Sequence, residues 1–289
     1  MTINQSLRNA QNILNENHVP NAEYDAFALF EYVTGYDKSQ YIMRANEEMP
    51  DDKQRQFEEL IAKRAKRIPL QHLTGNQNFF GYDFIVSSDV LVPRQDTEVL
   101  VSEVLSISSN YTCPISILDM CTGSGCIGVT LYLELNKAYG KCDITATDIS
   151  DKALDIARKN AEKLIGNSND FHIIKSDLFD ALDSSNKYDI IVSNPPYIPT
   201  SDIERLDTEV REHDPRMALD GGDDGLDFYK RIVDSATHFL EDGGQLVMEM
   251  GYNQGDDISA VMTDNGYSDI RIIKDLAGLD RVIGGYYVR

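Results

Sequence analysis

The feature that most constrains the fold is an apolar, strand-like run that leads through a glycine loop into the start of an apolar helix. The run covers residues 115–120, and the loop and helix start cover residues 121–128, with the sequence Cys-Thr-Gly-Ser-Gly-Cys-Ile-Gly. Glycines at positions 123 and 125 let the backbone approach a ligand closely. Because ligands of open α/β sheets bind at the carboxyl ends of the strands, the pattern predicts a parallel sheet with a binding site at this loop.

Two further strand-like runs also end in acidic residues. Residues 143–147 lead to Asp148, whose carboxylate suits the hydroxyls of a ribose, and residues 171–175 lead to Asp177, which suits an adenine amine. Asp119 lies inside the first run, where it could receive the ammonium group of an amino-acid moiety. Three acidic strand ends around one glycine loop predict a nucleoside pocket at the carboxyl edge of the sheet.

A fourth apolar run, residues 188–193, is followed by Asn194, Pro195, Pro196 and Tyr197. The prolines remove backbone donors and hold the chain extended, so the Asn194 carboxamide and the carbonyls after it can point outward as acceptors. An Asn oxygen and a backbone carbonyl can each accept one hydrogen of a planar NH2 group, while the Tyr197 ring packs on it. Alone, Asn-Pro-Pro is more often a strand that ends in a proline turn. Beside a nucleoside pocket, it predicts a site that holds an amide or exocyclic amine.

The glycine loop also fits a nicotinamide dinucleotide site, since Gly123-x-Gly125-x-x-Gly128 is followed by an acidic residue at position 148. Three features count against this alternative. Asp119 would crowd a pyrophosphate, Asp177 adds another acidic residue, and Asn-Pro-Pro-Tyr has no evident part in hydride transfer. An acidic pocket without phosphate-neutralising cations fits S-adenosylmethionine better than NAD.

Residues 115–197 resemble a class I S-adenosylmethionine-dependent methyltransferase of the amino-methylating type. The wider chain resembles the release factor glutamine methyltransferases, the PrmC or HemK family. The resemblance runs through several motifs in order: Gln71-His72-Leu73-Thr74-Gly75, Phe79-Phe80-Gly81, Val92-Pro93-Arg94-Gln95-Asp96-Thr97-Glu98, the glycine loop, Asn194 to Pro199, Ala218 to Leu226 and Asp275-Leu276-Ala277-Gly278. Two positions depart from the family pattern, with Cys121 in place of the usual Gly and Gln95 in place of the usual Pro.

The resemblance implies S-adenosylmethionine as cofactor, S-adenosylhomocysteine as its product, and specific site residues. The expected cofactor-binding residues are Asp119, Cys121, Thr122, Gly123, Ser124, Gly125, Asp148, Asp177, Leu178 and Asn194. The expected catalytic and substrate-binding residues are Asn194, Pro195, Pro196 and Tyr197, with Arg94 at the rim of the site. The resemblance also implies that the methyl acceptor is the glutamine of the Gly-Gly-Gln motif in peptide chain release factors, giving N5-methylglutamine.

The pattern of apolar residues changes twice along the chain. Residues 1–75 carry apolar side chains at helical spacing, which predicts a helical bundle. Because a glutamine on a flexible loop gives the pocket little to recognise, we expect this bundle to be the substrate-docking domain. Residues 76–93 are aromatic and alternating around Gly81, which predicts a β-hairpin connector. Residues 94–289 alternate between strand and helix patterns, so we expect an α/β fold with a Rossmann-like class I methyltransferase sheet there. Its later strands are expected at residues 245–250, 270–273 and 282–288.

The distribution of charged residues along the chain helps to choose between a protein and a nucleic-acid substrate. Residues 1–93 contain 9 basic and 13 acidic side chains, whereas residues 94–289 contain 18 basic and 35 acidic ones. DNA and RNA amino-methyltransferases also use Asn-Pro-Pro-Tyr, but they must hold a polyanion with clustered cations. The basic cluster at Lys63, Arg64, Lys66 and Arg67 is expected on the exposed face of a helix end. A protein substrate is therefore preferred, a nucleic-acid methyltransferase is the alternative, and a catalytically idle adaptor is disfavoured by the intact Asn194.

The remaining expectations concern location and metals. No apolar run reaches the length of a membrane span and the first twelve residues are polar, so we expect a cytoplasmic protein with no membrane partner. We also expect it to be a monomer that does not bind nucleic acid directly. Cys113, Cys121, Cys126 and Cys142 show no CxxC spacing, and the five histidines form no cluster with them, so we expect reduced thiols and no metal.

Two acidic features follow the turn from Asn194 to Tyr197, which is predicted to be catalytic. The connection from Ser201 to Asp227 is too long for an ordinary crossover, and we interpret it as a lid that contacts the substrate. Glu249, at the end of a strand, is interpreted as a buried, paired carboxylate outside the site.

Overall fold

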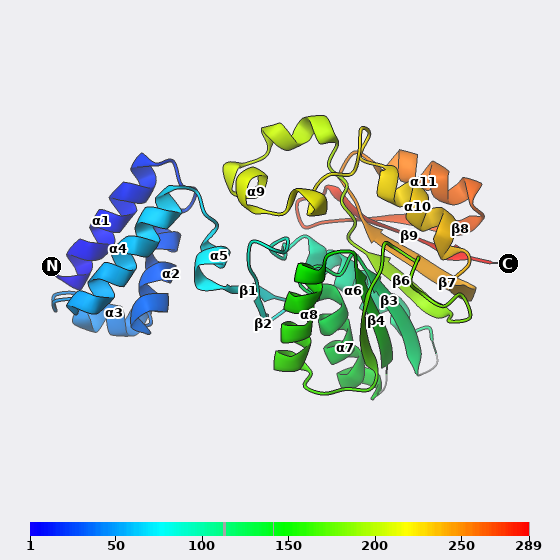
Figure 1. The fold of residues 1–289 in the computed structure, drawn as a ribbon, viewed down its shortest axis with the longest axis horizontal. Helices are drawn as coiled ribbons and strands as arrows, with labels where there is room; N and C mark the ends of the chain where they lie inside the picture. The colour runs from blue at the N-terminus through cyan, green and yellow to red at the C-terminus, as the bar shows by residue number, and fades with distance from the viewer. Residues whose placement is uncertain (112–113, 141, 289) are drawn as a thin grey trace. The chain divides into compact units, whose positions relative to one another are not determined.

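A computed structural model describes residues 1–111, 114–140 and 142–288 of the chain (Figure 1). It divides into two compact units. The first comprises Met1–Asn76 and Asp207–His213, and the second comprises Gln77–Leu206 and the chain from Asp214 onward. Residues 207–213, which the sequence patterns grouped with residues 94–289, therefore belong to the unit built by the N-terminal helices.

The first unit consists of helices packed around one apolar core. Their bounds are α1 Ile3–Glu16, α2 Ala22–Thr34, α3 Lys38–Arg44, α4 Asp51–Ala65, α5 Leu70–Thr74 and α9 Thr208–His213. α1 starts at a capping box, in which the Thr2 side chain accepts from the Gln5 amide and the Gln5 side chain accepts from the Thr2 amide. The predicted helical spacing is confirmed, since Ile3, Leu7 and Leu14 all lie in the core.

The basic cluster of α4 is not a solvated helix face as expected. Arg64 is buried, and its Nε lies 2.6 Å from Asp25 Oδ2 while its Nη2 lies 3.0 Å from Glu209 Oε1. Arg67 Nη2 lies 2.5 Å from Glu209 Oε2. Burial raises the pKa of the Asp25 carboxyl, which Arg64 opposes. The two arginines thus hold α9 within the first unit, and the prediction of an exposed cluster is wrong for them.

A two-stranded hairpin opens the second unit. β1 Asn76–Phe79 and β2 Tyr82–Ile85 are joined by Phe80 and Gly81, whose φ angles of 52° and 82° are those of a tight hairpin turn. Phe79 and Phe84 are buried, with ring centroids 6.0 Å apart at an interplanar angle of 75°. Both rings enter the core of the second unit, which anchors the hairpin there.

The main sheet of the second unit contains seven strands among the described residues, in the order β5-β4-β3-β6-β7-β9-β8. β9 runs antiparallel to β7 and β8, and the other neighbouring strands are parallel. The sheet therefore has the predicted Rossmann-like arrangement, with strand order reversing on either side of β3. The bounds are β3 Ile115–Met120, β4 Cys142–Asp148, β5 Phe171–Lys175, β6 Tyr188–Ser193, β7 Leu240–Glu249, β8 Tyr267–Lys274 and β9 Asp280–Tyr287.

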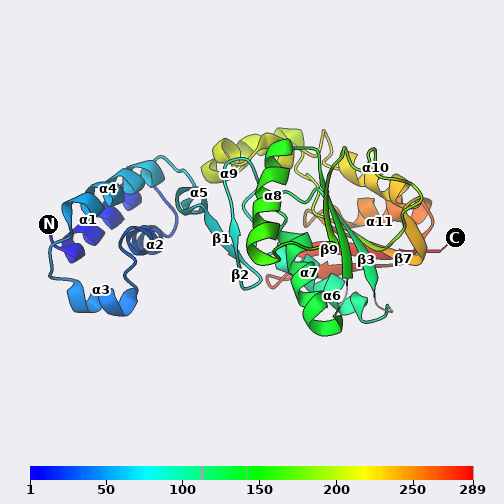
Figure 2. The same ribbon diagram turned by 60° about the horizontal axis from the view of Figure 1, so that its bottom comes forward.

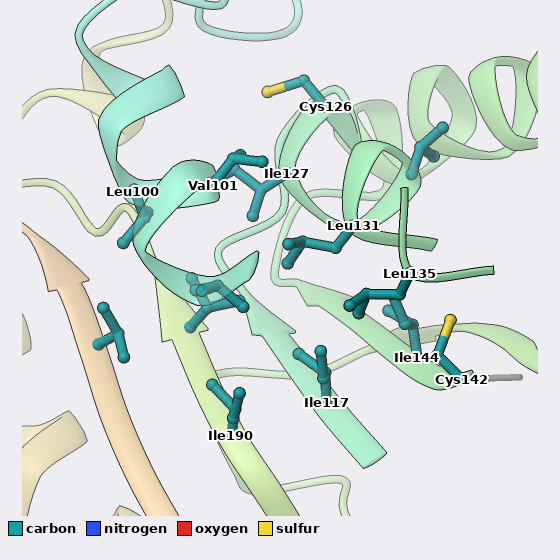
Figure 3. Close-up of a cluster of buried hydrophobic side chains, with 14 of the residues drawn as sticks. Leu100, Val101, Ile117, Cys126, Ile127, Leu131, Leu135, Cys142, Ile144 and Ile190 are labelled. Carbon is teal, nitrogen blue, oxygen red and sulfur yellow. The ribbon is translucent and has the colours of Figure 1, made fainter. Parts of the chain in front are cut away.

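Helices cover both faces of this sheet (Figure 1, Figure 2). α6 Thr97–Ser108, α7 Cys126–Tyr139 and α8 Asp151–Leu164 cover one face, and α10 Asp227–Ala236 and α11 Gly255–Asp264 cover the other. Figure 3 shows the first of these cores, in which Ile117 of β3 belongs to one apolar cluster with Val101 of α6 and Leu131 of α7. Its neighbour Leu118 belongs to the core on the opposite face. β3 is mostly apolar because it is buried on both sides, and Ser116 and Asp119 are its polar residues.

Two short 3-10 helices, η1 Thr200–Arg205 and η2 Arg216–Ala218, flank α9 in the long connection after β6. None of the helices in the part of the chain that the structure describes is long and apolar enough to cross a membrane.

Candidate active site

A cavity of about 360 Å³ lies at the carboxyl ends of β3, β4, β5 and β6, entirely within the second unit. Four successive strand ends contribute to its wall because parallel strands present their carboxyl ends along one edge. Of the predicted site residues, ten line it: Arg94, Cys121, Thr122, Gly123, Ser124, Asp148, Asp177, Leu178, Asn194 and Pro196. Asp119, Gly125, Pro195 and Tyr197 do not.

The glycine loop is held by backbone and carboxylate contacts. The Thr122 amide donates to the Thr147 carbonyl at 2.9 Å, and the Gly123 amide donates to Asp148 Oδ2 at 2.9 Å. α7 begins directly after Gly125, whose φ of 81° favours glycine. The loop thus brings backbone amides and a helix start to the cavity wall.

Asp119 lies behind this loop. Its Oδ2 accepts from the Thr122 hydroxyl at 2.5 Å and from the Gly128 amide at 2.9 Å, while its Oδ1 has no hydrogen-bond partner among the described residues. Burial raises its pKa to about 7. A Cβ at position 128 would lie 2.8 Å from Oδ2. The close approach of Asp119 therefore requires a glycine at position 128. This contact explains the third glycine of the Gly-x-Gly-x-x-Gly motif without any need for a bound dinucleotide.

The acidic ends of β4 and β5 differ in their surroundings. Asp148 accepts from the Gly123 amide through Oδ2 and from the Ser150 amide through Oδ1, at 2.9 Å each, and burial raises its pKa. Asp177 Oδ1 instead lies 2.8 Å from Nη2 of Arg231, at a half-exposed position. Each carboxylate oxygen keeps lone pairs for a ligand hydroxyl or amine.

Cys121 occupies a backbone position that favours glycine. Its φ is 59°, in the left-handed region, which is a physical reason for a glycine at this position. Burial raises the pKa of its thiol to about 12, so the side chain is neutral. Cys126 and Cys142 are buried, and Cys113 lies outside the described residues.

The turn that is predicted to be catalytic, Asn194 to Tyr197, follows β6. Asn194 lies at the cavity wall, and its Nδ2 donates to Thr97 Oγ1 over 3.4 Å, which leaves Oδ1 as an acceptor. Pro195 is not part of the wall, so the Asn194 oxygen is the acceptor that the geometry supports directly. Tyr197 points its hydroxyl at Glu249 Oε1, 3.3 Å away, and its ring packs against a buried apolar cluster.

The glycine-rich motif at 218–226 packs directly against this turn. The Ile198 amide donates to the Leu219 carbonyl at 3.0 Å, and the Gly221 amide donates to the Ile198 carbonyl at 2.9 Å. A Cβ at Gly221 would lie 2.8 Å from the Tyr197 Cα. The sequence identified the motif at 218–226 but did not predict that it supports the turn after β6. The adjacent glycines in the motif were the signal for such a close backbone approach.

We expect Gly221→Ala to lower the turnover number by about 10-fold, because a Cβ 2.8 Å from the Tyr197 Cα must displace the backbone of this turn, and a displacement of about 1 Å can cost about 10²-fold. Steady-state kinetics with a fixed, saturating cofactor concentration measure the effect. The matched control is Gly284→Ala, whose Cβ would have its nearest neighbour 3.4 Å away, an ordinary contact. Equal activities of the two variants would contradict the supporting role of Gly221.

The long connection returns to the cavity after α9. Arg94 Nη2 lies 2.7 Å from Asp214 Oδ2, and burial raises the pKa of Asp214 to about 6 against the effect of Arg94. Beyond Asp214, the wall includes Pro215, Met217, Ala218 and Asp220. The segment interpreted as a lid therefore supplies part of the wall, while its contact with substrate stays a prediction.

The residues that the structure describes include no group of three or more His, Cys, Asp or Glu side chains arranged to hold a metal ion. The charged and amide side chains of the cavity wall are four carboxylates, one carboxamide and two arginines, and both arginines are ion-paired. Threonine and serine hydroxyls and two cysteine thiols also line it.

Two family models match parts of this chain. Residues 5–75 match the PrmC N-terminal domain, and residues 95–209 match the methyltransferase small domain. A crystal structure of a methyltransferase from Pyrococcus furiosus has the same fold, with a TM-score of 0.52 and 19% identity over 73% of this chain and 91% of that one.

Relatives match over almost the whole length. A release factor glutamine methyltransferase from Geobacter sulfurreducens is 38% identical over 98% of this chain and 96% of its own length. The Agrobacterium fabrum protein of the same name is 37% identical over 98% and 96%. With its helical first unit, its class I methyltransferase sheet and Asn194 at the cavity wall, the chain belongs to the release factor glutamine methyltransferase family.

Proposed function

We propose that this protein transfers the methyl group of S-adenosylmethionine to the side-chain amide nitrogen, N5, of the glutamine in the Gly-Gly-Gln motif of peptide chain release factors. The observation that carries the proposal is the position of Asn194. It lies on the wall of the same cavity as the glycine loop and Asp148, with its oxygen left as an acceptor. The names of the full-length relatives support the choice of release factor glutamine as substrate.

The cavity suits a sulfonium cofactor. Its acidic side chains are Asp89, Asp148, Asp177 and Asp220, and its cations are Arg94 and Arg231. Arg94 is paired with Asp214 and Arg231 with Asp177, so neither is left to neutralise a pyrophosphate. Asp148 would hold the ribose, Asp177 would accept from the adenine amine, and the loop from Cys121 to Gly125 would hold the amino-acid part. A net negative wall favours a positively charged cofactor over NAD.

The mechanism follows from the chemistry of a side-chain amide. Its nitrogen is a poor nucleophile because its lone pair is delocalised, and the bound cofactor supplies a strongly electrophilic methyl group. Asn194 Oδ1, on the cavity wall, accepts an N–H hydrogen of the amide, orients the nitrogen and stabilises the positive charge that develops on it. The Pro195 carbonyl, which the sequence predicts as the second acceptor, does not line the cavity. No strong base is needed beforehand, since the proton becomes acidic only as the new bond forms.

A protein substrate fits the charge of this chain better than a nucleic acid. Residues 94–289 carry 35 acidic against 18 basic side chains, and two cations of the basic cluster, Arg64 and Arg67, are used in internal ion pairs. Holding a polyanion needs clustered, accessible cations. We propose that the helical first unit docks the release factor, and that the protein acts as a monomer in the cytoplasm.

The test is methyl incorporation from labelled S-adenosylmethionine into purified release factor, rRNA and DNA. We expect label in the release factor alone, and none when the glutamine of Gly-Gly-Gln is replaced by alanine. Label in rRNA or DNA but not in protein would overturn the proposal. A short Gly-Gly-Gln peptide should be a much poorer substrate than the intact factor, and equal rates would exclude docking by the first unit.

Asp148→Ala is expected to weaken S-adenosylmethionine binding by about 10-fold, because it removes hydrogen bonds to the ribose as well as an acceptor for the Gly123 amide. Isothermal titration calorimetry with S-adenosylhomocysteine measures this change. NAD should give no heat of binding with either protein. Tight NAD binding without a response to S-adenosylhomocysteine would favour the dehydrogenase alternative.

A further inference from the structure

A buried carboxamide lies directly behind the turn that follows β6, without contributing to the cavity wall. Gln254 immediately precedes α11 and is only 6% exposed. Its Nε2 donates to the Tyr197 carbonyl at 3.0 Å and to the Gly225 carbonyl at 3.2 Å, and its Oε1 accepts from the Gly251 amide at 2.9 Å. One side chain therefore joins this turn to the end of the glycine-rich motif at 218–226 and to the chain after β7.

The backbone closes tightly around this carboxamide. A Cβ at position 225 would lie 2.5 Å from the Tyr197 carbonyl oxygen and 2.7 Å from Gln254 Nε2. A Cβ at position 251 would lie 2.7 Å from Gln254 Oε1. Both positions therefore require glycine, because a larger residue at either one would displace the carboxamide from its partners.

The three partners match the hydrogen-bonding groups of a carboxamide. Two of them are carbonyl oxygens, which accept, and the third is a backbone amide, which donates. A carboxamide nitrogen carries two hydrogens and its oxygen is an acceptor, so one orientation of Gln254 satisfies all three. A buried polar network in which every group is paired holds its members in one arrangement. The Tyr197 carbonyl, three residues after Asn194, is thereby held in place.

A second carboxamide is bonded in the same way behind the glycine loop. Asn160 lies in α8 and is fully buried. Its Nδ2 donates to the carbonyls of Ser124 and Ile85 at 2.9 Å each, and its Oδ1 accepts from the Ile85 amide at 2.7 Å. Ser124 belongs to the glycine loop and lines the cavity, whereas Asn160 does not. Asn160 therefore joins the loop to the end of the hairpin formed by β1 and β2.

The two networks have no residue in common. Gln254 precedes α11 and Asn160 lies in α8, and these helices cover opposite faces of the sheet (Figure 1, Figure 2). We propose that both are positioning residues with separate tasks: Gln254 holds the turn that carries Asn194, and Asn160 holds the loop that carries the cofactor. This inference rests on the proposed function and adds to it how the two reactants are placed independently of each other.

Gln254→Glu and Asn160→Asp are the paired tests. Each keeps the shape of the side chain but replaces its NH2 group by an oxygen, so neither can donate to two carbonyls. For Gln254→Glu we expect about 10-fold lower kcat, with S-adenosylhomocysteine affinity within about 2-fold of the native value. For Asn160→Asp we expect about 10-fold weaker S-adenosylhomocysteine binding and a much smaller fall in kcat at saturating cofactor. Equal losses of kcat and affinity in both variants would overturn the proposal.

Calorimetry of S-adenosylhomocysteine binding also reports the folded fraction of each variant. A variant that only unfolds loses binding sites at unchanged affinity, and its kcat falls in the same proportion. The kcat is therefore expressed per binding site. After this correction, a native kcat in Gln254→Glu or a native affinity in Asn160→Asp would exclude the role of that residue.

Gly225→Ala tests the Gln254 bridge from its other side, since the added Cβ would overlap both the Tyr197 carbonyl and Gln254 Nε2. We expect a fall in kcat of about 10-fold or more. The matched control is Gly166→Ala, because its φ of 76° is close to the 74° of Gly225. No atom of a described residue beyond its chain neighbours lies within 4 Å of the Cβ added at Gly166. This control has the same backbone strain and should keep kcat within about 2-fold, so equal kcat values in the two variants would contradict the bridge.

A readout without turnover separates this proposal from the proposed function. In 15N NMR, the side-chain NH2 signals of Asn194, assigned by their absence in Asn194→Ala, should shift in Gln254→Glu while the backbone amide signal of Gly123 stays in place. Asn160→Asp should give the opposite result. These outcomes hold whichever molecule is methylated. Signals that shift alike in both variants, or in neither, would overturn the separate tasks even if release factor is methylated.

Discussion

Asn194→Ala is expected to lower the turnover number by about 10²- to 10³-fold, or about 2.7 to 4 kcal/mol of transition-state stabilisation. The substitution removes a preorganised acceptor on the cavity wall, held by Thr97, at the position where charge develops on the amide nitrogen. Cofactor affinity should fall only a few-fold, because Asp148 and the glycine loop provide separate contacts. Single-turnover methylation of release factor, with calorimetry of S-adenosylhomocysteine binding, measures both quantities.

The control for this variant is Asn186→Ala, at an exposed position in the loop before β6. It should leave turnover within about 2-fold of the native value, as surface substitutions usually change little. Turnover of Asn194→Ala within a few-fold of the native protein would exclude the proposed role of its oxygen. A parallel loss of cofactor binding would instead assign Asn194 to the cofactor.

Arg64→Leu is expected to lower the free energy of unfolding of the first unit by about 3 to 5 kcal/mol. The substitution leaves the Asp25 carboxylate buried without its cation, and removes one of two arginines that hold Glu209. Hydrogen exchange of α2 and α4 amides under native conditions reports the stability of this unit separately from that of the sheet.

Two further variants test whether an unpaired buried charge causes the loss of stability in Arg64→Leu. Arg158→Leu removes an exposed ion pair with Asp155 and should cost at most about 0.5 kcal/mol. Asp25→Leu combined with Arg64→Leu removes both charges of the buried pair, and should recover much of the lost stability, since apolar pairs often replace buried ion pairs without loss. If the double variant is as unstable as Arg64→Leu alone, the cost comes from packing and not from an unpaired charge.

Several parts of the site could be predicted from the sequence because they depend on short stretches of chain. The predicted bounds of β3 and β6 are those of the structure, since a strand buried on both faces is mostly apolar. The glycine loop, Asp148 and Asn194 each follow a strand, and parallel strands bring their carboxyl ends to one edge. Their convergence on one cavity therefore follows from the topology that the strand and helix pattern implies.

The sequence by itself determined the sheet, the strand ends that build the cavity and the turn that carries Asn194, because backbone periodicity and turn chemistry are local properties. Only the tertiary structure decided that Arg64 is buried against Glu209, 145 residues away, and that Thr97 meets Asn194, 97 residues away. It also decided that Asp119 supports the loop from behind and that Gly221 supports the catalytic turn. Such contacts depend on which side chains the packed elements bring within a few ångströms of one another, and no local pattern of residues specifies that.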